Sequence, residues 1–318
     1  MNNRITVLGS FVVDLMGRAD HLPLPGETVL GSSFKMGPGG KGSNQAAAAH
    51  RAGGNVVFIT KLGRDLFSSI AREFYASEGM NTDYLFEDAD EPTGTALILV
   101  DEKTSQNSIL VNPGACENIS PENMSAAEEV ISSSSILLTQ LETNIDVLEP
   151  AVKAFRSKTS SSLKNNLKTA ILNPAPVRKI GREILSLFDI ITPNEVEASI
   201  LSGIEVTDFS SAEKAADYFI ESGVETVIIT MGEQGCFIKN SSITETVPAF
   251  HVEAIDTTGA GDAFNGGLAA ALASGKSIVD AAVFATATAA LSVTKIGTAP
   301  AMPHIAEIEE KICSNQPG

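Results

Sequence analysis

Short apolar runs alternate with amphipathic or small-residue segments along most of the chain. The apolar runs predict buried strands at residues 5–8, 56–60, 135–138, 169–172, 188–191 and 226–230. The other segments predict helices at 46–49, 65–77, 121–131, 145–155, 212–222, 277–293 and 305–313. Residues 158–168 are rich in Ser, Lys and Asn and predict an exposed connection. Strands that alternate with helices favour an α/β fold with a mostly parallel sheet.

Two stretches, at about 12–36 and 94–112, break this alternation. The second holds apolar runs at 95–101 and 108–111 around a polar turn, which predicts a hairpin. The first predicts an extended segment near Met16 and further exposed strands at 28–30 and 34–36, with turns between them. We therefore expect a single domain over 1–318, with these strands inserted as a small separate sheet that forms a lid.

Most of the predicted strands end in polar or glycine-rich turns. The clearest turns begin at Asn173, Thr192 and Met231. The carboxyl ends of parallel strands meet at one edge of a sheet, where ligands bind in open α/β folds. Asp14 follows the first strand and belongs to the same edge, although a solvated loop position would explain it equally well.

A glycine-rich loop at 37–45 precedes the helix that begins near Ala46. It contains four glycines around Lys41 and ends in Asn44 and Gln45. Glycine allows a backbone to approach a ligand closely. The loop is not a P-loop, because Gly42 follows the Gly-Lys pair where that motif needs Ser or Thr. Lys41 and Asn44 offer donors suited to hydroxyl groups.

A second turn, 256–262, opens a small-residue helix and carries Asp262 in its first turn. Unpaired N–H groups at a helix start attract anions. A carboxylate beside such a site has two interpretations. It could act as a base beside a transferring phosphoryl group, or it could simply favour the positive end of the helix dipole.

The net charge, the cysteine spacing and the lengths of the apolar runs narrow the expected binding partners and cellular setting. A formal net charge of −17 argues against nucleic acid or an anionic membrane as the partner. Cys116, Cys236 and Cys313 are widely spaced and predict neither disulfides nor a zinc site. The N-terminus does not resemble a signal peptide, and no apolar run approaches the ~20 residues of a membrane span. A reduced, cytoplasmic setting is expected.

The stretches 39–46 and 256–264 resemble the two signatures of the ribokinase family of carbohydrate kinases, the PfkB family. The likeness runs almost end to end, through 25–28, 140–142, 173–176, 192–195 and 230–232. Within the family, the stretches 39–45 and 173–176 are most similar to those of ribokinases. The resemblance implies a doubly wound α/β domain with a small β lid that often forms a homodimer.

The resemblance also implies ATP-dependent phosphorylation of a sugar hydroxymethyl group, with ribose as the expected pentose and Mg²⁺ and K⁺ as cofactors. Asp262 is then the catalytic base, beside an anion hole formed by Gly259, Ala260 and Gly261. Residues expected to bind the sugar are Asp14, Gly39, Gly40, Lys41, Asn44, Glu142 and Asp262. Residues expected at the nucleotide and Mg²⁺ are Asn194, Glu197, Thr230, Gly232, Gly235, Gly261 and Thr286. The monovalent cation is expected at Asp256 and Thr258, with carbonyls near Ser292, Lys295 and Gly297.

Three positions depart from the ribokinase pattern. Val12 replaces an Asn that often precedes the sugar-binding Asp, Thr286 replaces an adenine-side Asn or His, and Ala301 replaces a Ser near the cation. A kinase of fructose, deoxyribose or a nucleoside therefore remains an alternative. A catalytically silent sugar- or nucleotide-binding protein is a second alternative, although the carboxylate beside the 259–261 turn argues against it.

Overall fold

The computed structural model describes residues 3–104, 106–157 and 168–314. Its main sheet contains β1 (Arg4–Leu8), β4 (Asn55–Gly63), β5 (Leu85–Asp88), β8 (Ile136–Thr139), β9 (Thr169–Leu172), β10 (Ile190–Ile191), β11 (Thr226–Thr230), β12 (Cys236–Asn240) and β13 (Thr244–Val247). The nine strands lie in the order β13-β12-β11-β10-β9-β8-β1-β4-β5. Pairing is parallel except where β12 joins β11 and β13. The expected mostly parallel sheet is confirmed.

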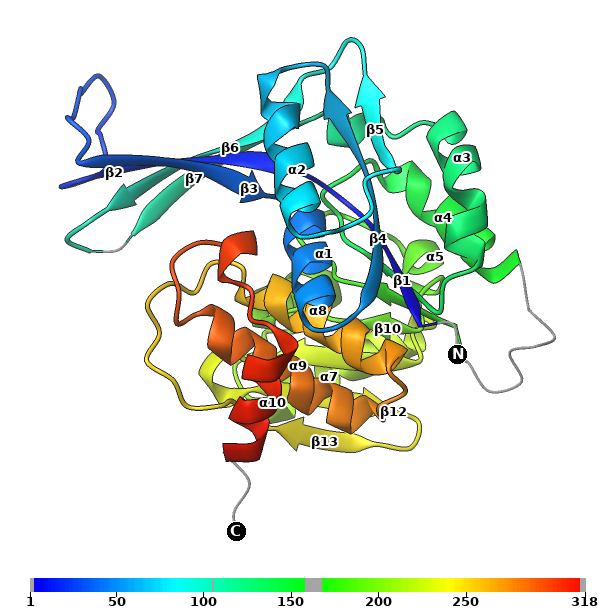
Figure 1. Cartoon of the computed structure of the whole chain (residues 1–318). Helices are drawn as coiled ribbons and strands as arrows, with labels where there is room; N and C mark the ends of the chain where they lie inside the picture. Colours follow the sequence, from blue (N-terminus) through cyan, green and yellow to red (C-terminus); the bar gives the residue numbers. More distant parts are fainter. Residues whose placement is uncertain (1–2, 105, 158–167, 315–318) are drawn as a thin grey trace.

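Helices cover both faces of this sheet (Figure 1). One face packs against α1 (Lys41–Arg51), α2 (Leu66–Ser77), α8 (Ala260–Ala273), α9 (Ile278–Ser292) and α10 (Ile305–Ser314). The other packs against α3 (Pro121–Ser132), α4 (Leu148–Ser157), α5 (Arg182–Leu185), α6 (Glu195–Ser202) and α7 (Phe209–Glu221). Successive residues of a strand point to opposite faces of the sheet. In β11, Ile228 packs in the core under α8 and α9, while Val227 and Ile229 pack in the core on the other face. The doubly wound arrangement is confirmed.

Single 3₁₀ turns complete the helical segments: η1 (Ala115–Asn118), η2 (Ile145–Val147), η3 (Gly232–Gln234) and η4 (Ala299–Ala301). Within the described residues, no helix is both long and apolar enough to cross a membrane.

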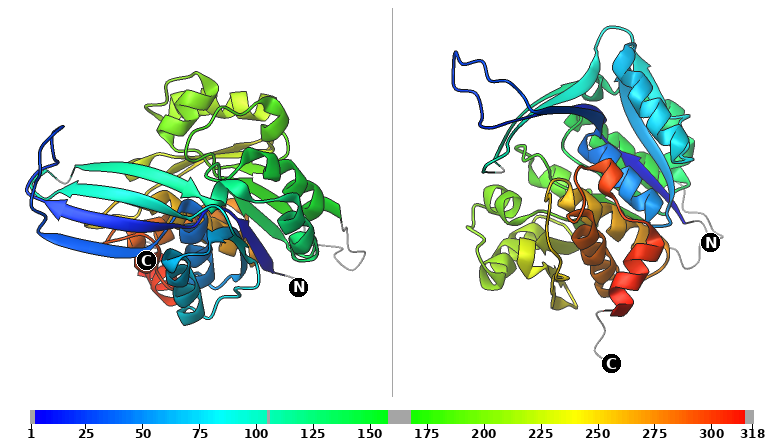
Figure 2. Two further views of the ribbon diagram at one scale, coloured as in Figure 1. Left: turned by 90° about the horizontal axis from the view of Figure 1, so that it is seen from above. Right: turned by 60° about the vertical axis from the view of Figure 1, so that its left-hand side comes forward.

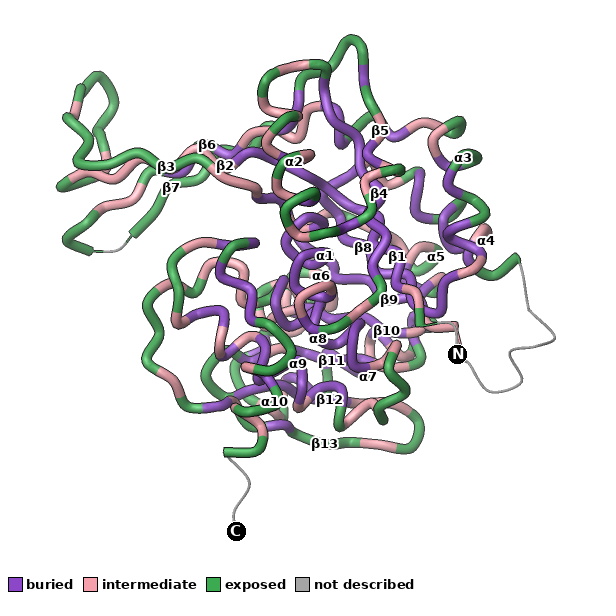
Figure 3. Tube along the Cα trace, in the orientation of Figure 1, coloured by how far each residue is buried: buried purple, intermediate pink, exposed green. Residues whose placement is uncertain are grey.

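A separate four-stranded sheet projects from the body beside α1 and α2 (Figures 1 and 2). Its strands are β2 (Val12–Ala19), β3 (Ser33–Gly39), β6 (Thr93–Asp101) and β7 (Asn107–Gly114), in the order β3-β2-β6-β7. The predicted hairpin is confirmed as β6 and β7. Most of this sheet is exposed or half-buried, unlike the core strands (Figure 3).

Several elements differ from the sequence-based expectation. The expected strand at 34–36 lies within β3 (Ser33–Gly39), whereas the expected strand at 28–30 is not a strand. Strands β12 and β13 at the edge of the main sheet, together with β5 and α6, were not predicted. Edge strands such as β13, with the sequence TETV, mix polar and apolar residues and so lack the apolar run on which the prediction relied. The expected connection at 158–168 lies almost wholly outside the described residues.

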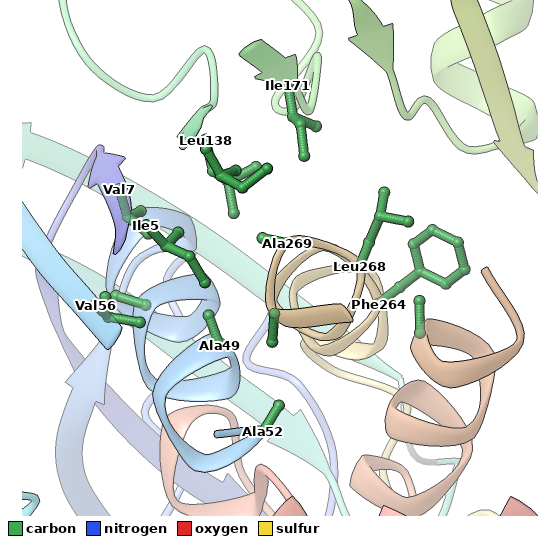
Figure 4. Close-up of a cluster of buried hydrophobic side chains, with 14 of the residues drawn as sticks. Ile5, Val7, Ala49, Ala52, Val56, Leu138, Ile171, Phe264, Leu268 and Ala269 are labelled. Carbon is green, nitrogen blue, oxygen red and sulfur yellow. The ribbon is translucent and has the colours of Figure 1, made fainter. Parts of the chain in front are cut away.

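Small residues bring α1 and α8 into close contact. A Cβ added at Gly266 would lie 2.4 Å from the Ala48 Cβ and 2.7 Å from the Gln45 carbonyl oxygen. Ala49, Leu268 and neighbouring side chains pack between these helices and the strands (Figure 4). The alanine- and glycine-rich sequences of both helices therefore set side by side the two first turns that follow the glycine-rich segments.

Candidate active site

Asp262 lies in the first turn of α8 and is 7% exposed. Its Oδ2 accepts a hydrogen bond from Asn44 Nδ2, and its Oδ1 accepts one from Gln45 Nε2, both at 2.9 Å. Burial raises the pKa of Asp262, while the Lys41 charge and the two amide donors oppose that rise. The carboxylate is thus a stronger base than a free Asp, and each oxygen keeps a further lone pair for a ligand.

The turn before α8 leaves backbone donors without a side-chain cap. Gly259 is the N-cap residue, with a φ of 78° in the left-handed region, which glycine adopts without strain. Glycine has no side chain to cap the first turn that follows, Ala260 to Asp262; within that turn the Ala260 N–H donates to the Thr257 carbonyl at 3.3 Å. N–H groups at such a helix start attract an anion. The structure therefore places anion-binding geometry directly beside the Asp262 carboxylate.

Glu142 joins the loop after β8 to the start of α1. Its Oε2 accepts a hydrogen bond from the Lys41 backbone N–H at 2.8 Å and another from the Ser10 hydroxyl. Burial opposes the charge of Lys41, but the carboxylates of Asp262, Glu142 and Glu197 raise its pKa. Lys41 thus carries its positive charge among acidic groups from three separate parts of the chain.

Asp14 enters the same region from β2 of the small sheet. Gly39 lies against it: a Cβ there would come within 2.1 Å of the Asp14 carboxylate. Burial, together with the charges of Glu142 and Asp262, raises the Asp14 pKa to about 6, while a hydrogen bond from Thr298 opposes the rise. The Thr298 hydroxyl lies 3.3 Å from Asp14 Oδ2. The expected sugar-binding residues therefore converge, with Gly40 as the N-cap of α1 between them.

The expected nucleotide residues lie along the neighbouring strand ends. Asn194 and Glu197 form a capping box at the start of α6, in which each side chain accepts a hydrogen bond from the backbone N–H of the other. Thr230 pairs with Asn194 through a β-bridge. Burial raises the Glu197 pKa, and the Lys41 charge opposes that rise. The Asn-x-x-Glu pattern therefore has a structural role and also lies within electrostatic reach of Lys41.

Of the three other expected nucleotide positions, two follow β11 and one lies in α9. Gly232 begins η3 and Gly235 follows it, with φ values of 52° and 97°. Thr286 is buried in α9, where its hydroxyl donates to the Ala282 carbonyl at 2.8 Å and faces Cys236. The Thr286 hydroxyl is therefore already paired within its own helix.

Among the expected cation residues, Asp256 connects its own loop to the loop that contains Gly297. Asp256 accepts hydrogen bonds from the backbone N–H groups of Thr258 and Gly297, each at 3.0 Å. The Ser292 hydroxyl bonds within its helix, and the Lys295 ammonium forms an ion pair with Glu307 at 2.9 Å. In Ser292 and Lys295, therefore, the backbone carbonyl rather than the side chain is suited to a cation.

Two contacts of the site were not anticipated from the sequence. Gln45 donates a hydrogen bond to Asp262. The feature of the sequence that could have indicated this contact is an amide side chain next to a run of alanines in a helix that proves to be buried. Thr298 bonds Asp14 from a loop 284 residues away, and no local pattern marks it. Val12 lies 3% exposed in an apolar cluster with Ala96 and Ile98.

Known proteins are similar to this chain in both sequence and overall fold. A model described as "pfkB family carbohydrate kinase" matches residues 2–305. Ribokinase of Haemophilus influenzae is 42% identical over 303 residues, covering 95% of this chain and 96% of that protein. Deoxyribokinase of Salmonella typhi is 34% identical over 313 residues, covering 98% and 99%. The structure of Arabidopsis thaliana ribokinase complexed with ribose and ATP matches with a TM-score of 0.88 at 28% identity, covering 98% of this chain and 99% of that one. The resemblance inferred from the sequence is confirmed, and the chain belongs to the pfkB family of carbohydrate kinases.

Proposed function

We propose that this protein transfers the terminal phosphoryl group of ATP to the hydroxymethyl group of a pentose, converting ribose to ribose 5-phosphate. The observation that carries the proposal is the position of Asp262. Its carboxylate is oriented by two amides, its pKa is raised by burial, and it lies in the first turn of a helix whose N–H groups suit an anion. The ribokinase relatives support ribose as the acceptor.

In the proposed reaction, the oxygen of the sugar hydroxymethyl group attacks the terminal phosphorus of ATP. Asp262 accepts the proton that this hydroxyl group loses. A new O–P bond forms, and the bond from that phosphorus to the bridging oxygen breaks, releasing ADP. The N–H groups of the 259–261 turn stabilise the negative charge on the transferring group. Asp14 and Glu142 accept hydrogen bonds from sugar hydroxyls, while Lys41 and Asn44 donate them.

Mg²⁺ and K⁺ fit the oxygen donors of the site. The described residues hold no group of three or more His, Cys, Asp or Glu side chains suited to a metal, which favours Mg²⁺ held mainly by nucleotide phosphates beside Asn194 and Glu197. Mg²⁺ would neutralise phosphate charge there. Asp256 and nearby carbonyls offer the oxygen ligands that K⁺ prefers, and K⁺ would hold the 256–259 turn in shape. Ala301 offers no hydroxyl to this second site.

The small sheet has an apolar face suited to a second copy of the chain. Phe34, Met36, Leu97, Leu99 and Leu110 lie on one face and are 43–67% exposed. Asp14 lies on the opposite face. We infer that the sheet forms a lid over the sugar and a homodimer contact. Phe34→Asp should halve the mass measured by light scattering, and an unchanged mass would contradict the contact.

A second acceptor, 2-deoxyribose, is favoured by Val12. This side chain is buried among apolar neighbours and offers no hydrogen bond where ribokinases often place Asn. A sugar hydroxyl left unpaired in a binding site costs affinity, and a sugar with one hydroxyl fewer avoids that cost. The deoxyribokinase relative is consistent with this alternative.

A sugar panel tests the proposal. ADP release is measured with ribose, 2-deoxyribose, fructose and adenosine, each with and without K⁺, for the wild type and Val12→Asn. We expect turnover with a pentose, and Val12→Asn should raise the ratio of kcat/KM for ribose to that for 2-deoxyribose. Turnover only with fructose or adenosine would contradict the pentose assignment. Sugar binding without turnover of any acceptor would support the silent binding protein.

A further inference from the structure

Gln45 is a fully buried amide in the first half of α1, where its neighbours Ala46 to Ala49 are apolar. Its exposed fraction is 0%. Burial of an amide among apolar residues is unfavourable unless its hydrogen bonds are satisfied. Gln45 therefore needs polar partners inside the protein, and the identity of those partners suggests what it does.

All the partners of Gln45 are buried polar side chains. Its Nε2 donates to Asp262 Oδ1 and to Asn173 Oδ1, each at 2.9 Å, and its Oε1 accepts from Gln140 Nε2 at 2.6 Å. The Gln140 donor fixes which end of the Gln45 amide is which. Rotation of that amide by half a turn would direct its carbonyl oxygen at the Asp262 carboxylate and at Asn173 Oδ1, which are both acceptors.

The hydrogen bonds continue from Asn173 to the first turn of α8. Asn173 Nδ2 donates to the Thr192 carbonyl at 3.0 Å, and the Thr192 hydroxyl donates to Asn265 Oδ1 at 2.6 Å. Asn265 Nδ2 then donates to the Gly261 carbonyl at 2.8 Å. The chain of bonds thus begins at the Asp262 carboxylate and returns to the residue before it, through the residues that directly follow β9 and β10 and through α8.

We propose that Gln45 is a positioning residue for the phosphoryl transfer, and that the relay Gln140–Gln45–Asn173–Thr192–Asn265 holds the Asp262 carboxylate and the Gly261 turn in a fixed relation. This inference rests on the proposed function of Asp262 as base. Asn44 orients the second carboxylate oxygen but faces the sugar region, whereas Gln45 is sealed in the interior. Gln45 acts on the reaction through Asp262 and, by the other end of the relay, through the Gly261 turn.

The relay makes a specific prediction for Gln45→Met, which keeps the length of the side chain but removes the amide. The Asp262 carboxylate would lose a donor that favours its ionised form, so the pKa of Asp262 would rise. The carboxylate would also rotate more freely, and misplacement of a reacting group costs rate rather than binding. We expect kcat to fall by ~10- to 10²-fold, with sugar KM changed by less than about threefold.

The pH profile separates positioning from a general loss of structure. Charged groups that face Asp262 from other elements are Lys41, Glu142, Asp14 and Glu197, and they remain in the variant. The acidic limb of kcat against pH should move to higher pH in Gln45→Met. Gln45→Glu, of nearly equal volume, should move it further, because a second carboxylate would face Asp262. If Gln45→Met does not fold, Gln45→Glu carries the test.

Asn118→Ala is the matched control. Asn118 also donates from its amide to a buried carboxylate, Asp88, at 2.6 Å, but it lies outside the proposed site. This variant should lose stability without any change in the acidic limb. An independent readout that needs no turnover is the ¹³C titration of Asp-labelled protein, with the Asp262 signal assigned from Asp262→Asn.

The outcomes distinguish the relay from the function on which it rests. The relay is supported if the Asp262 signal of Gln45→Met titrates at a higher pH than in the wild type and kcat falls at constant KM. An unchanged Asp262 titration in folded Gln45→Met or Gln45→Glu overturns it, whether or not the protein is active. A wild type that phosphorylates no sugar contradicts the proposed function alone.

Discussion

Asp88 and Asp262 are both buried carboxylates, but their surroundings differ completely. Asp88 is 5% exposed at the end of β5 and forms an ion pair with Lys61 at 2.8 Å. It also accepts hydrogen bonds from the backbone of Asp90 and Glu91 and from the Asn118 amide. The Lys61 contact, followed by the other donors, holds the pKa of Asp88 well below its usual range. Asp262 has two neutral amide donors, and burial raises its pKa.

The comparison shows how the same side chain serves two purposes. Donors surround Asp88, so its charge is neutralised and its oxygens are occupied, which suits a structural anchor at the base of the small sheet. Asp262 is oriented but keeps acceptor capacity and a raised proton affinity, which suits a base. Substitutions at the two kinds of site should therefore have different effects, on stability at Asp88 and on the reaction around Asp262.

Asp88→Asn should destabilise the protein by about 3–5 kcal/mol, because it leaves the Lys61 charge buried without its partner. The free energy of unfolding is measured by urea denaturation at pH 7. Because the Asp88 pKa is lowered on folding, its contribution is present at neutral pH and is lost only under acidic conditions. The folded variant should keep kcat within about twofold. A large fall in kcat without loss of stability would show that Asp88 takes part in the reaction, and would contradict the purely structural role given to it here.

Lys41→Met and Glu142→Gln should raise the sugar KM by ~10-fold or more, since hydrogen bonds to charged groups contribute about 1.5–3 kcal/mol. Steady-state kinetics over a range of sugar concentrations measures this change. Lys103→Met, which alters a lysine on the small sheet outside the site, is the control and should leave KM unchanged. An unchanged KM in both site variants would remove Lys41 and Glu142 from the sugar site.

Asp14→Asn should produce a smaller, pH-dependent gain in stability. The folded-state pKa of Asp14 is about 6, above its ordinary value of 3.8, so ionisation of Asp14 disfavours the folded state as the pH rises. The Tm advantage of the variant should grow between about pH 4 and about pH 6 and then stay constant, at roughly 4 °C. Thermal melts at several pH values measure it. A constant difference across that range would show that Asp14 titrates normally.

Much of the fold was predictable from the sequence because apolar runs and helix caps are local signals. Strands β9 and β11 have the predicted limits, and the helix expected at 277–293 is α9, with Ser277 as its N-cap. The edge strands were not found, because they need no continuous apolar run. Helix α6 was missed, although its capping box was present in the sequence at Asn194 and Glu197.

The site was predictable to the extent that glycine and carboxylate positions carry chemistry by themselves. Both glycine-rich segments were identified, and the structure brings Asn44 and Asp262 together. The hydrogen bonds that hold these residues in position could not be predicted. Gln45 and Asp262 are 217 residues apart, and their contact depends on how closely α1 and α8 pack. A hydrogen bond between distant segments leaves no pattern in either segment.

The central claim is that Asp262 is the base, and Asp262→Asn tests it most directly. Asparagine is nearly isosteric but cannot accept the proton. The measurement is kcat for the preferred sugar at saturating ATP, alongside sugar binding by calorimetry and the unfolding midpoint. We predict that kcat falls by ~10²-fold or more, while the fold and sugar binding are retained. Near wild-type turnover in the folded variant would contradict the account.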